Sequence, residues 1–203
     1  MSSPLIILLA LALWGFVHSL LASLRVKRLV RRRLGDLARR SYRLAYNVFA
    51  GASLLPVLAL VGLLPDRRLY TIAFPWLLMT AALQGLAFLA LLIGLLQTGV
   101  SSFLGLSQLL SPTNGEHSEL VLHGFYRWVR HPLYTAGLIF IWANPVMTAN
   151  LLALNIGLTL YILIGAQIEE RKLVQQFGET YRQYQKQTPM LFPCPLRRLG
   201  PRG

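Results

Sequence analysis

The stretch Pro4–Leu24, PLIILLALALWGFVHSLLASL, runs for 21 residues without an Asp, Glu, Lys or Arg. A helix of about 20 mostly apolar residues is long enough to cross the hydrocarbon core of a bilayer. No basic residue precedes this run, whereas many follow it from Arg25 onward. A cleaved signal peptide has the opposite order of charges, so we expect the segment to remain as a membrane anchor.

Apolar blocks of similar length recur along the chain. Only 13% of the residues are charged and 55% are hydrophobic, whereas a soluble domain carries about a quarter charged residues. The later blocks are Leu44–Leu64, Ile72–Leu96, Leu133–Ala149 and Asn150–Ile168. The last two are short and meet in a turn-prone region, so they are predicted to form a tight helical hairpin. The predicted fold is an all-α integral membrane protein with five transmembrane helices and a cytosolic C-terminal helix.

The distribution of basic residues predicts the orientation. Arg25–Arg43 contains nine Lys or Arg residues against one acid, Asp36. With five spans and the N-terminus outside, 18 of the 20 basic residues fall on the cytoplasmic side, as the positive-inside rule requires. The same juxtamembrane segment, next to anionic lipid head groups, explains the net charge of +13. Nucleic-acid binding is not expected, because no known nucleic-acid-binding motif accompanies these charges.

The chain is predicted to form a single domain over residues 1–203, because it contains no internal repeat and no low-complexity linker. Its one cysteine, Cys194, excludes a disulfide framework and a thiolate metal cluster. His117 and His123 have no metal-ligand spacing to an acid or a cysteine, so no metal site is predicted.

His18 is a polar residue inside the first apolar block. In one interpretation it is an interfacial histidine satisfied by a neighbouring helix, with Ser19 bonding back to its own helix. In the other it lines a cavity in which a substrate binds. Position alone slightly favours the first interpretation, because His18 lies near the cytosolic interface, where a polar side chain is easily hydrated.

Arg130, His131 and Pro132 occur where a helix is predicted to begin. Proline suits the first helical position because its missing N–H would have no partner there anyway. Arg130 and His131 would then lie beside unpaired backbone N–H groups and the positive end of the helix dipole, a place that binds anions such as a carboxylate. A basic interfacial anchor with a helix cap explains these residues equally well.

Glu169 and Glu170 end the last apolar block and begin a predicted polar helix over residues 169–185. A solvated first turn with neighbouring Arg and Lys partners is one explanation. Two adjacent carboxylates at the end of an apolar helix, however, repel each other and face anionic lipid, and a cationic ligand would relieve both effects. Together with the basic pair at 130–131, they indicate a cytosol-facing pocket for a ligand that carries both charges.

The second half of the chain contains a set of residues whose identities and spacing are typical of a known family: Gly124-Phe-Tyr126, Arg130-His-Pro-Leu-Tyr134, Glu169-Glu170, Leu173, Phe177-Gly178, Tyr181, Tyr184 and Pro189–Pro193. This set resembles the C-terminal half of the membrane methyltransferase superfamily, which includes isoprenylcysteine carboxyl methyltransferases and phospholipid methyltransferases. Phe140–Thr148, Gly105-Leu-Ser-Gln108 and the early His18-Ser19 further resemble the bacterial methanethiol S-methyltransferase branch. NnrU-like membrane proteins share the early His-Ser feature.

The resemblance implies that S-adenosylmethionine binds within residues 97–203, and that the acceptor enters from the bilayer among the three spans of residues 1–96. The basic pair would hold the cofactor carboxylate, the acidic pair would orient its amino group or the pocket residues, and three residues would help to wall the adenosyl part: Gln108, Gly124 and Tyr126. The implied cofactor residues are Gln108, Gly124, Tyr126, Arg130, His131, Pro132, Tyr134, Glu169 and Glu170.

The acceptor is predicted from one departure and one requirement. Carboxyl-methylating relatives carry an arginine four residues before the first Glu of the pair, whereas this chain has Gly165. That difference favours a small or lipophilic thiol, which must lose its proton before it can attack. His18 would lie nearer the acceptor as the catalytic base while His131 serves the cofactor. A dry pocket that strengthens the attraction between thiolate and sulfonium would make a dedicated base unnecessary.

The predicted function is therefore a multi-pass methyltransferase of a bacterial cytoplasmic membrane, with the N-terminus outside and the C-terminus cytoplasmic. The alternatives are an isoprenylcysteine-type carboxyl methyltransferase and a non-catalytic NnrU-like membrane protein. A small transporter ranks last, because the chain does not show the two related halves that are usual in transporters.

Overall fold

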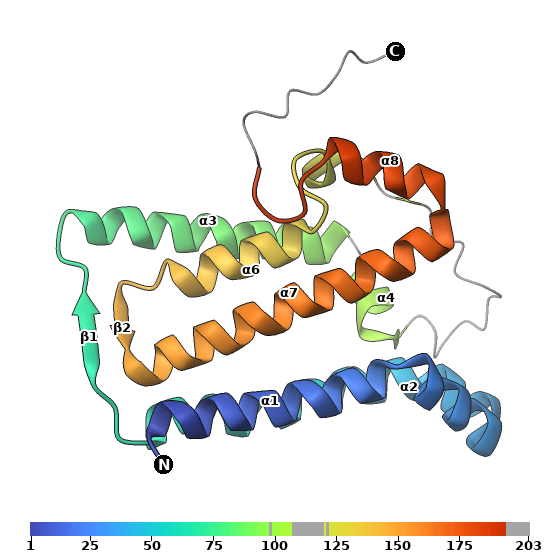
Figure 1. Cartoon of the computed structure of the whole chain (residues 1–203), viewed down its shortest axis with the longest axis horizontal. Helices are drawn as coiled ribbons and strands as arrows, with labels where there is room; N and C mark the ends of the chain where they lie inside the picture. The colour runs from blue at the N-terminus through green and yellow to red at the C-terminus, as the bar shows by residue number, and fades with distance from the viewer. Residues whose placement is uncertain (98, 107–119, 121, 194–203) are drawn as a thin grey trace. The chain divides into compact units, whose positions relative to one another are not determined.

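The computed structural model describes residues 1–97, 99–106, 120 and 122–193 (Figure 1). These residues are mostly helical, as predicted. The helices are α1 Ser3–Ala22, α2 Leu24–Leu63, α3 Trp76–Gln97, α4 Val100–Leu104, the 3-10 helix η1 Gly124–Arg127, α6 Pro132–Trp142, α7 Ala149–Phe177 and α8 Glu179–Gln187. Two short strands, β1 Arg68–Thr71 and β2 Val146–Thr148, pair with each other.

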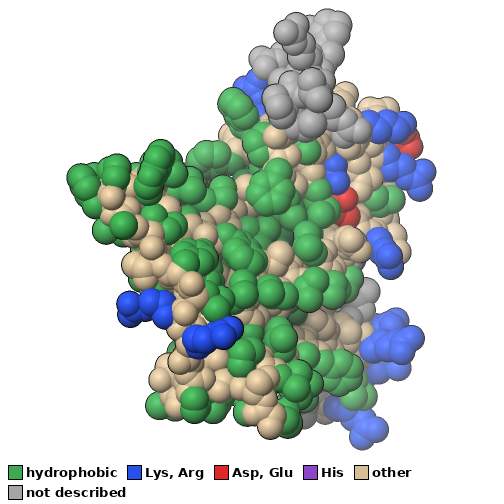
Figure 2. Space-filling model, turned by 60° about the vertical axis from the view of Figure 1, so that its left-hand side comes forward, with side chains coloured by type: hydrophobic (Ala, Val, Ile, Leu, Met, Phe, Trp, Pro, Cys, Tyr) green, Lys and Arg blue, Asp and Glu red, His purple; other side chains and the backbone are tan. Residues whose placement is uncertain are grey.

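Four of the described helices are long and apolar enough to cross a membrane. They are Ser3–Ala22, Arg40–Leu63, Trp76–Leu96 and Ala149–Phe177. Many of their large hydrophobic side chains are exposed, and Figure 2 shows how strongly hydrophobic side chains dominate the visible surface. The protein is therefore a multi-pass membrane protein by helix length and composition.

The predicted block Leu133–Ala149 does not form a full-length helix. Its helix, α6, has 11 residues and ends at Trp142, which corresponds to about 16 Å at 1.5 Å per residue. The residue before a proline is disfavoured in the α conformation, and proline has no N–H to continue the helix, so Asn144-Pro145 ends the helical path. Five helices of spanning length are thus not found among the described residues.

Helix α2 consists of two helical parts joined at a break. Gly35 has φ 73° and ψ −164° inside the helix, a left-handed φ that glycine adopts without strain. The first part begins after Ser23, whose side chain accepts a hydrogen bond from the backbone N–H of Val26 and so caps the helix. The basic residues before the break are thereby separated from the apolar span that begins at Arg40.

The chain forms two compact units whose segments alternate along the sequence. The first comprises residues 1–74, 95–115 and 145–158, and the second comprises residues 75–94, 116–144 and 159–203. Helix α7 begins in the first unit and ends in the second. In the first unit α1 lies along α2, and a hydrophobic cluster of buried side chains consists of Ile7, Leu11, Val57, Ala153 and Leu154.

A short sheet and two reciprocal caps close one end of the first unit. Strand β1 pairs antiparallel with β2. Asp66 Oδ1 accepts the backbone N–H of Asn150 at 3.0 Å, near the start of α7. Asn150 Nδ2 in turn donates to the carbonyl oxygens of Val61, Leu64 and Pro65 at 3.3–3.4 Å, at the end of α2. Each helix end therefore satisfies backbone groups of the other that would otherwise lack partners. The all-α prediction did not include this sheet, because neither strand is long enough to show an alternating pattern.

Replacing Asn150, which is 0% exposed, tests the carbonyl cap. We expect Asn150→Ala to lower the free energy of unfolding by about 1–3 kcal/mol, because three carbonyls lose a buried donor. Asn150→Asp should cost more, because a buried carboxylate would face those same carbonyl oxygens. Thermal unfolding in detergent measures both effects. The matched control is Asn47→Ala, which removes an exposed hydrogen bond from the side-chain amide to the carbonyl of Leu104. Equal effects of the Ala and Asp variants would contradict this account.

Asp66 should make the stability depend on pH. Burial acts to raise its pKa, but hydrogen bonds from Thr148, Asn150, Arg67 and Ala149 outweigh it and hold the pKa below the ordinary value of 3.8. The stabilisation is therefore complete above pH 3.8 and is lost as the pH falls through the lower folded-state pKa. We expect Asp66→Ala to lose about 0.5–2 kcal/mol near neutral pH, and its melting temperature should depend less on pH than that of wild type between about pH 5 and 3. Parallel pH curves would refute the role.

Candidate functional site

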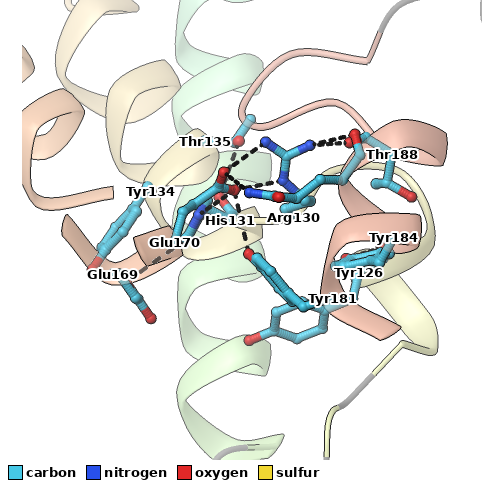
Figure 3. Close-up of polar contacts among 11 residues, drawn as sticks. Tyr126, Arg130, His131, Tyr134, Thr135, Glu169, Glu170, Tyr181, Tyr184 and Thr188 are labelled. Carbon is cyan, nitrogen blue, oxygen red and sulfur yellow. Dashed lines mark hydrogen bonds and ion pairs between the residues drawn. The ribbon is translucent and has the colours of Figure 1, made fainter. Parts of the chain in front are cut away.

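The predicted helix start at Pro132 is confirmed and forms one wall of a polar cluster in the second unit. Pro132 occupies the first turn of α6 and His131 is the residue before it. The cluster also receives the last turns of α7, helix α8 and the segment that follows α8 (Figure 3). All of these residues belong to the same compact unit.

Arg130 and Glu170 form a bidentate ion pair at the centre of the cluster. Arg130 Nε donates to Glu170 Oε1 at 2.5 Å, and Nη2 donates to Oε2 at 2.9 Å. Nη1 donates to the carbonyl oxygens of Gln185, at 3.0 Å, and Thr188. The side chain of Arg130 is only 10% exposed. A guanidinium has five N–H donors, so the protein itself occupies most of them.

Glu170 accepts hydrogen bonds on both oxygens. Besides Arg130, Oε1 lies 3.2 Å from His131 Nε2 and 3.3 Å from the hydroxyl of Tyr181. Oε2 accepts from Gln185 Nε2 at 2.7 Å. A carboxylate offers about four lone-pair positions, so these four residues saturate it. Glu170 is thus the hub of the cluster, as Figure 3 shows.

Glu169 has a different environment although it is the adjacent residue. Its side chain is 46% exposed. It accepts a hydrogen bond from Tyr134 Oη at 2.8 Å and lies 3.8 Å from His131 Nδ1. The ring of Tyr134 stacks on that of His131, with centroids 5.3 Å apart. His131 therefore lies between the two carboxylates, and Glu169 is the one that remains accessible.

The segment after α8 covers the start of α6. The backbone N–H groups of Arg130 and His131 donate to the carbonyls of Pro189 and Met190, at 2.9 and 3.1 Å. Thr135 Oγ1 donates to Leu191 O at 2.5 Å, and both residues are buried. The two backbone N–H groups just ahead of α6 are thus bonded to the protein's own chain.

The predicted polar helix over residues 169–185 is divided. Helix α7 continues through Glu169 to Phe177, and α8 begins at Glu179. Between them Gly178 has φ 58°, which breaks the helix at a residue that tolerates it. The turn brings the rings of Tyr181 and Tyr184 into an edge-to-face pair with centroids 5.8 Å apart. Both are buried, and burial raises the pKa of Tyr184 to about 12.

The remaining predicted site residues differ in how they are placed. Gly124 begins η1 with φ 65°, and the carbonyl of Tyr126 accepts a hydrogen bond from Tyr184 Oη at 2.5 Å. Both belong to the second unit, together with the cluster. His18 belongs to the first unit, where its Nε2 lies 2.7 Å from Tyr46 Oη. Gln108 lies outside the described residues.

Four residues of the cluster were not predicted from the sequence to belong to the site. They are Thr135, Tyr181, Gln185 and Thr188. Tyr181 and Gln185 lie four residues apart, so they share one face of α8. The polar side chain of Gln185 on this otherwise aromatic face could have indicated its role from the sequence. The contributions of Gln185 and Thr188 through backbone carbonyls left no signal in the sequence.

Similarity to known proteins is found in the part of the chain that contains the charged residues of the cluster. Residues 83–180 match the phospholipid methyltransferase family. The methanethiol S-methyltransferase of Mycobacterium tuberculosis is 47% identical over 75 residues, which cover 37% of this chain and 31% of that protein. The enzyme of the same name from Pseudomonas deceptionensis is 42% identical over 102 residues, or 50% of this chain and 38% of that protein.

A more distant relative is the protein-S-isoprenylcysteine O-methyltransferase of Schizosaccharomyces pombe, 38% identical over 88 residues that cover 41% of this chain and 36% of that protein. No solved structure matches. The aligned regions span about a third of the length of these curated relatives, 31–38%. The resemblance seen in the sequence is confirmed, and residues 83–180, which match the phospholipid methyltransferase family, contain the Arg130–Glu170 ion pair.

Proposed function

We propose that this protein is an integral membrane methyltransferase that uses S-adenosylmethionine to methylate a small thiol such as methanethiol. The observation that carries the proposal is the organised cluster around Glu169 and Glu170, whose charged residues lie within the segment that matches the phospholipid methyltransferase family. Relatives named methanethiol S-methyltransferase support the thiol acceptor. Gly165, where carboxyl-methylating relatives carry arginine, supports a thiol over a carboxylate.

The chemistry of the cluster fits one end of the cofactor well. Glu169 is a half-exposed carboxylate held by Tyr134, so it is suited to bind the amino group. In this proposal Arg130 and Glu170 act as a support, because their polar atoms already bind protein groups. His131 orients Glu169 through its Nδ1, while its Nε2 faces Glu170. The proposed cofactor contacts are Gln108, Gly124, Tyr126, His131, Pro132, Tyr134 and Glu169, and Arg130 and Glu170 hold these contacts in place.

S-adenosylmethionine, when bound, supplies an electrophilic methyl group on a sulfonium sulfur. The protein has to align the acceptor sulfur with that methyl group and to exclude water. A thiol must also be deprotonated, since the thiolate is the nucleophile. We propose His18 as the base, because histidine is the side chain that exchanges protons near neutral pH.

We further propose that the chain crosses the membrane five times although only four described helices have spanning length. From Ala149 to Glu170, α7 rises about 30 Å. His131, which contacts Glu170, lies at the start of the other limb of the predicted hairpin. That path consists of α6, about 16 Å long, and six residues of extended chain, which reach up to about 20 Å. A short helix with an extended end is thus long enough to form the other limb of the hairpin.

The orientation is tested with the single native cysteine. With the C-terminus in the cytoplasm of a bacterial cytoplasmic membrane, we expect a membrane-impermeant thiol reagent to label Cys194 in inverted vesicles and not in intact spheroplasts. The matched control is Cys194→Ser combined with Arg68→Cys, which should show the opposite pattern because Arg68 begins β1, between the second and third spans, and the proposed topology places that connection outside. Labelling of Cys194 from outside would reverse the proposed topology.

The two carboxylates should respond differently to the same substitution. Glu169→Gln should weaken S-adenosylmethionine binding about 10–100-fold, because a charge-assisted hydrogen bond is lost, with little change in melting temperature. Glu170→Gln should lower the free energy of unfolding by about 3–5 kcal/mol, because it leaves Arg130 buried without its counter-charge. Calorimetric titration and thermal unfolding in detergent measure the two effects. Unchanged cofactor binding by Glu169→Gln would remove its proposed role.

Transfer of a labelled methyl group tests the function itself. Wild-type protein in nanodiscs should methylate methanethiol and short alkanethiols and should leave an isoprenylcysteine analogue unmodified. Methylation of the analogue's carboxylate instead would support the carboxyl methyltransferase alternative. Failure to bind S-adenosylmethionine in detergent and in nanodiscs would refute the proposal and favour a non-catalytic NnrU-like role.

A further inference from the structure

Four aromatic rings form a row between α1 and α2 in the first unit. Trp14 stacks on His18 with centroids 4.9 Å apart and planes 21° apart. His18 meets Tyr46 on the next helix at 4.8 Å and 38°. Tyr42, one turn earlier on that helix, stacks on Tyr46 at 6.5 Å and 12°. The row places His18 between an indole and a phenol, in a segment that is otherwise strongly apolar.

Hydrogen bonds fix the rings on both sides of the histidine. Tyr46 Oη lies 2.7 Å from His18 Nε2 and 3.1 Å from Nδ1, so the hydroxyl is within reach of either nitrogen. Trp14 Nε1 donates to the carbonyl of Ala50 at 3.2 Å and to Ser53 Oγ at 3.1 Å. The orientation of the indole is therefore set by α2 and not by packing alone.

These neighbours suit a histidine that gains and loses a proton. A tyrosine hydroxyl both donates and accepts, so Tyr46 can pair with a neutral ring in either tautomer and can accept from the charged ring. An indole face attracts a cation within about 6 Å of its centroid. An imidazolium in apolar surroundings requires such partners, because burying an unpaired charge costs several kcal/mol or more.

We propose that Tyr46 and Trp14 are positioning residues that hold His18 while it takes the proton of a neutral thiol acceptor. This inference rests on the proposed function. The S–H bond breaks and the proton moves to a ring nitrogen of His18. A sulfur electron pair then forms the new S–CH3 bond as the C–S bond of the sulfonium donor breaks, which releases a neutral thioether. The imidazolium returns its proton to water.

The test compares two phenols of the same helix. Tyr46→Phe removes the hydroxyl that contacts His18, whereas Tyr42→Phe removes one that donates to the backbone carbonyl of Leu21 at 2.6 Å. Thiol methylation is measured in nanodiscs from pH 6.5 to 9.5, with kcat and KM separated, and S-adenosylmethionine affinity is measured by calorimetry. The two substitutions are equally conservative, so a difference between them reports on the contact with His18.

We expect Tyr46→Phe to lower kcat about 10–100-fold at pH 7, within the range of general-base effects, while cofactor affinity and melting temperature stay near those of wild type. The deficit should shrink as the pH approaches the pKa of the thiol, because a thiolate formed in solution needs no base. Tyr42→Phe should stay close to wild type at every pH. A purely structural role of Tyr46 would not produce this convergence.

A pH-independent deficit, an equal loss in Tyr42→Phe, or full activity of Tyr46→Phe would overturn the inference. So would wild-type protein that methylates only an acceptor without a thiol. The absence of cofactor binding by wild-type protein would instead refute the proposed function, so the two failures are distinguishable. If Tyr46→Phe does not fold, Trp14→Phe replaces it in the same pH series. The phenyl ring keeps an aromatic face beside His18 but attracts the imidazolium less strongly than indole does.

Discussion

The buried pair of Arg130 and Glu170 organises the second unit. Two charges removed from water are stable together only when their geometry is good and their remaining hydrogen-bonding positions are filled. The guanidinium therefore requires carbonyl oxygens in addition to the carboxylate, and α8 and the residues after it supply them through Gln185 and Thr188. The carboxylate requires further donors, and His131, Tyr181 and Gln185 supply those. The return of the chain after Gly178 follows from this requirement.

The same pair explains how adjacent acids acquire different roles. Consecutive residues of a helix point about 100° apart, so when Glu170 faces Arg130, Glu169 must face elsewhere. It faces Tyr134 and the open side of the cluster. A site that needs an accessible carboxylate can thus be built beside a saturated one without any change of backbone. The saturated residue holds the elements in place, and the accessible one is available to a ligand.

The first unit meets the related problem of helix ends near a membrane. Backbone groups at the ends of helices need partners, and lipid offers none. Asp66, just after α2, accepts a backbone N–H at the start of α7, and Asn150, near the start of α7, donates to carbonyl groups at the end of α2. The aromatic row around His18 solves the same problem for a side chain, since both neighbours can serve a polar ring in an apolar span.

The sequence predicted the long elements well because their signals are local. Length and hydropathy alone identified the three N-terminal spans, and Pro132 marked the start of α6. It overestimated the next block, since hydropathy continues past Trp142 although Asn144-Pro145 ends the helix there. Family spacing pointed to Arg130 and Glu170, but their partners lie 11 to 58 residues away and include backbone carbonyls.

The sequence by itself determined that this is a helical membrane protein and which charged residues lie at the ends of its helices, because apolar length and charge can be read residue by residue. Only the tertiary structure decided that Arg130 binds Glu170 and not the open side of the site, and that Glu169 stays accessible. The choice between equivalent acids depends on helix rotation and on the distant carbonyls of α8 and the segment after it, and neither is encoded in local spacing.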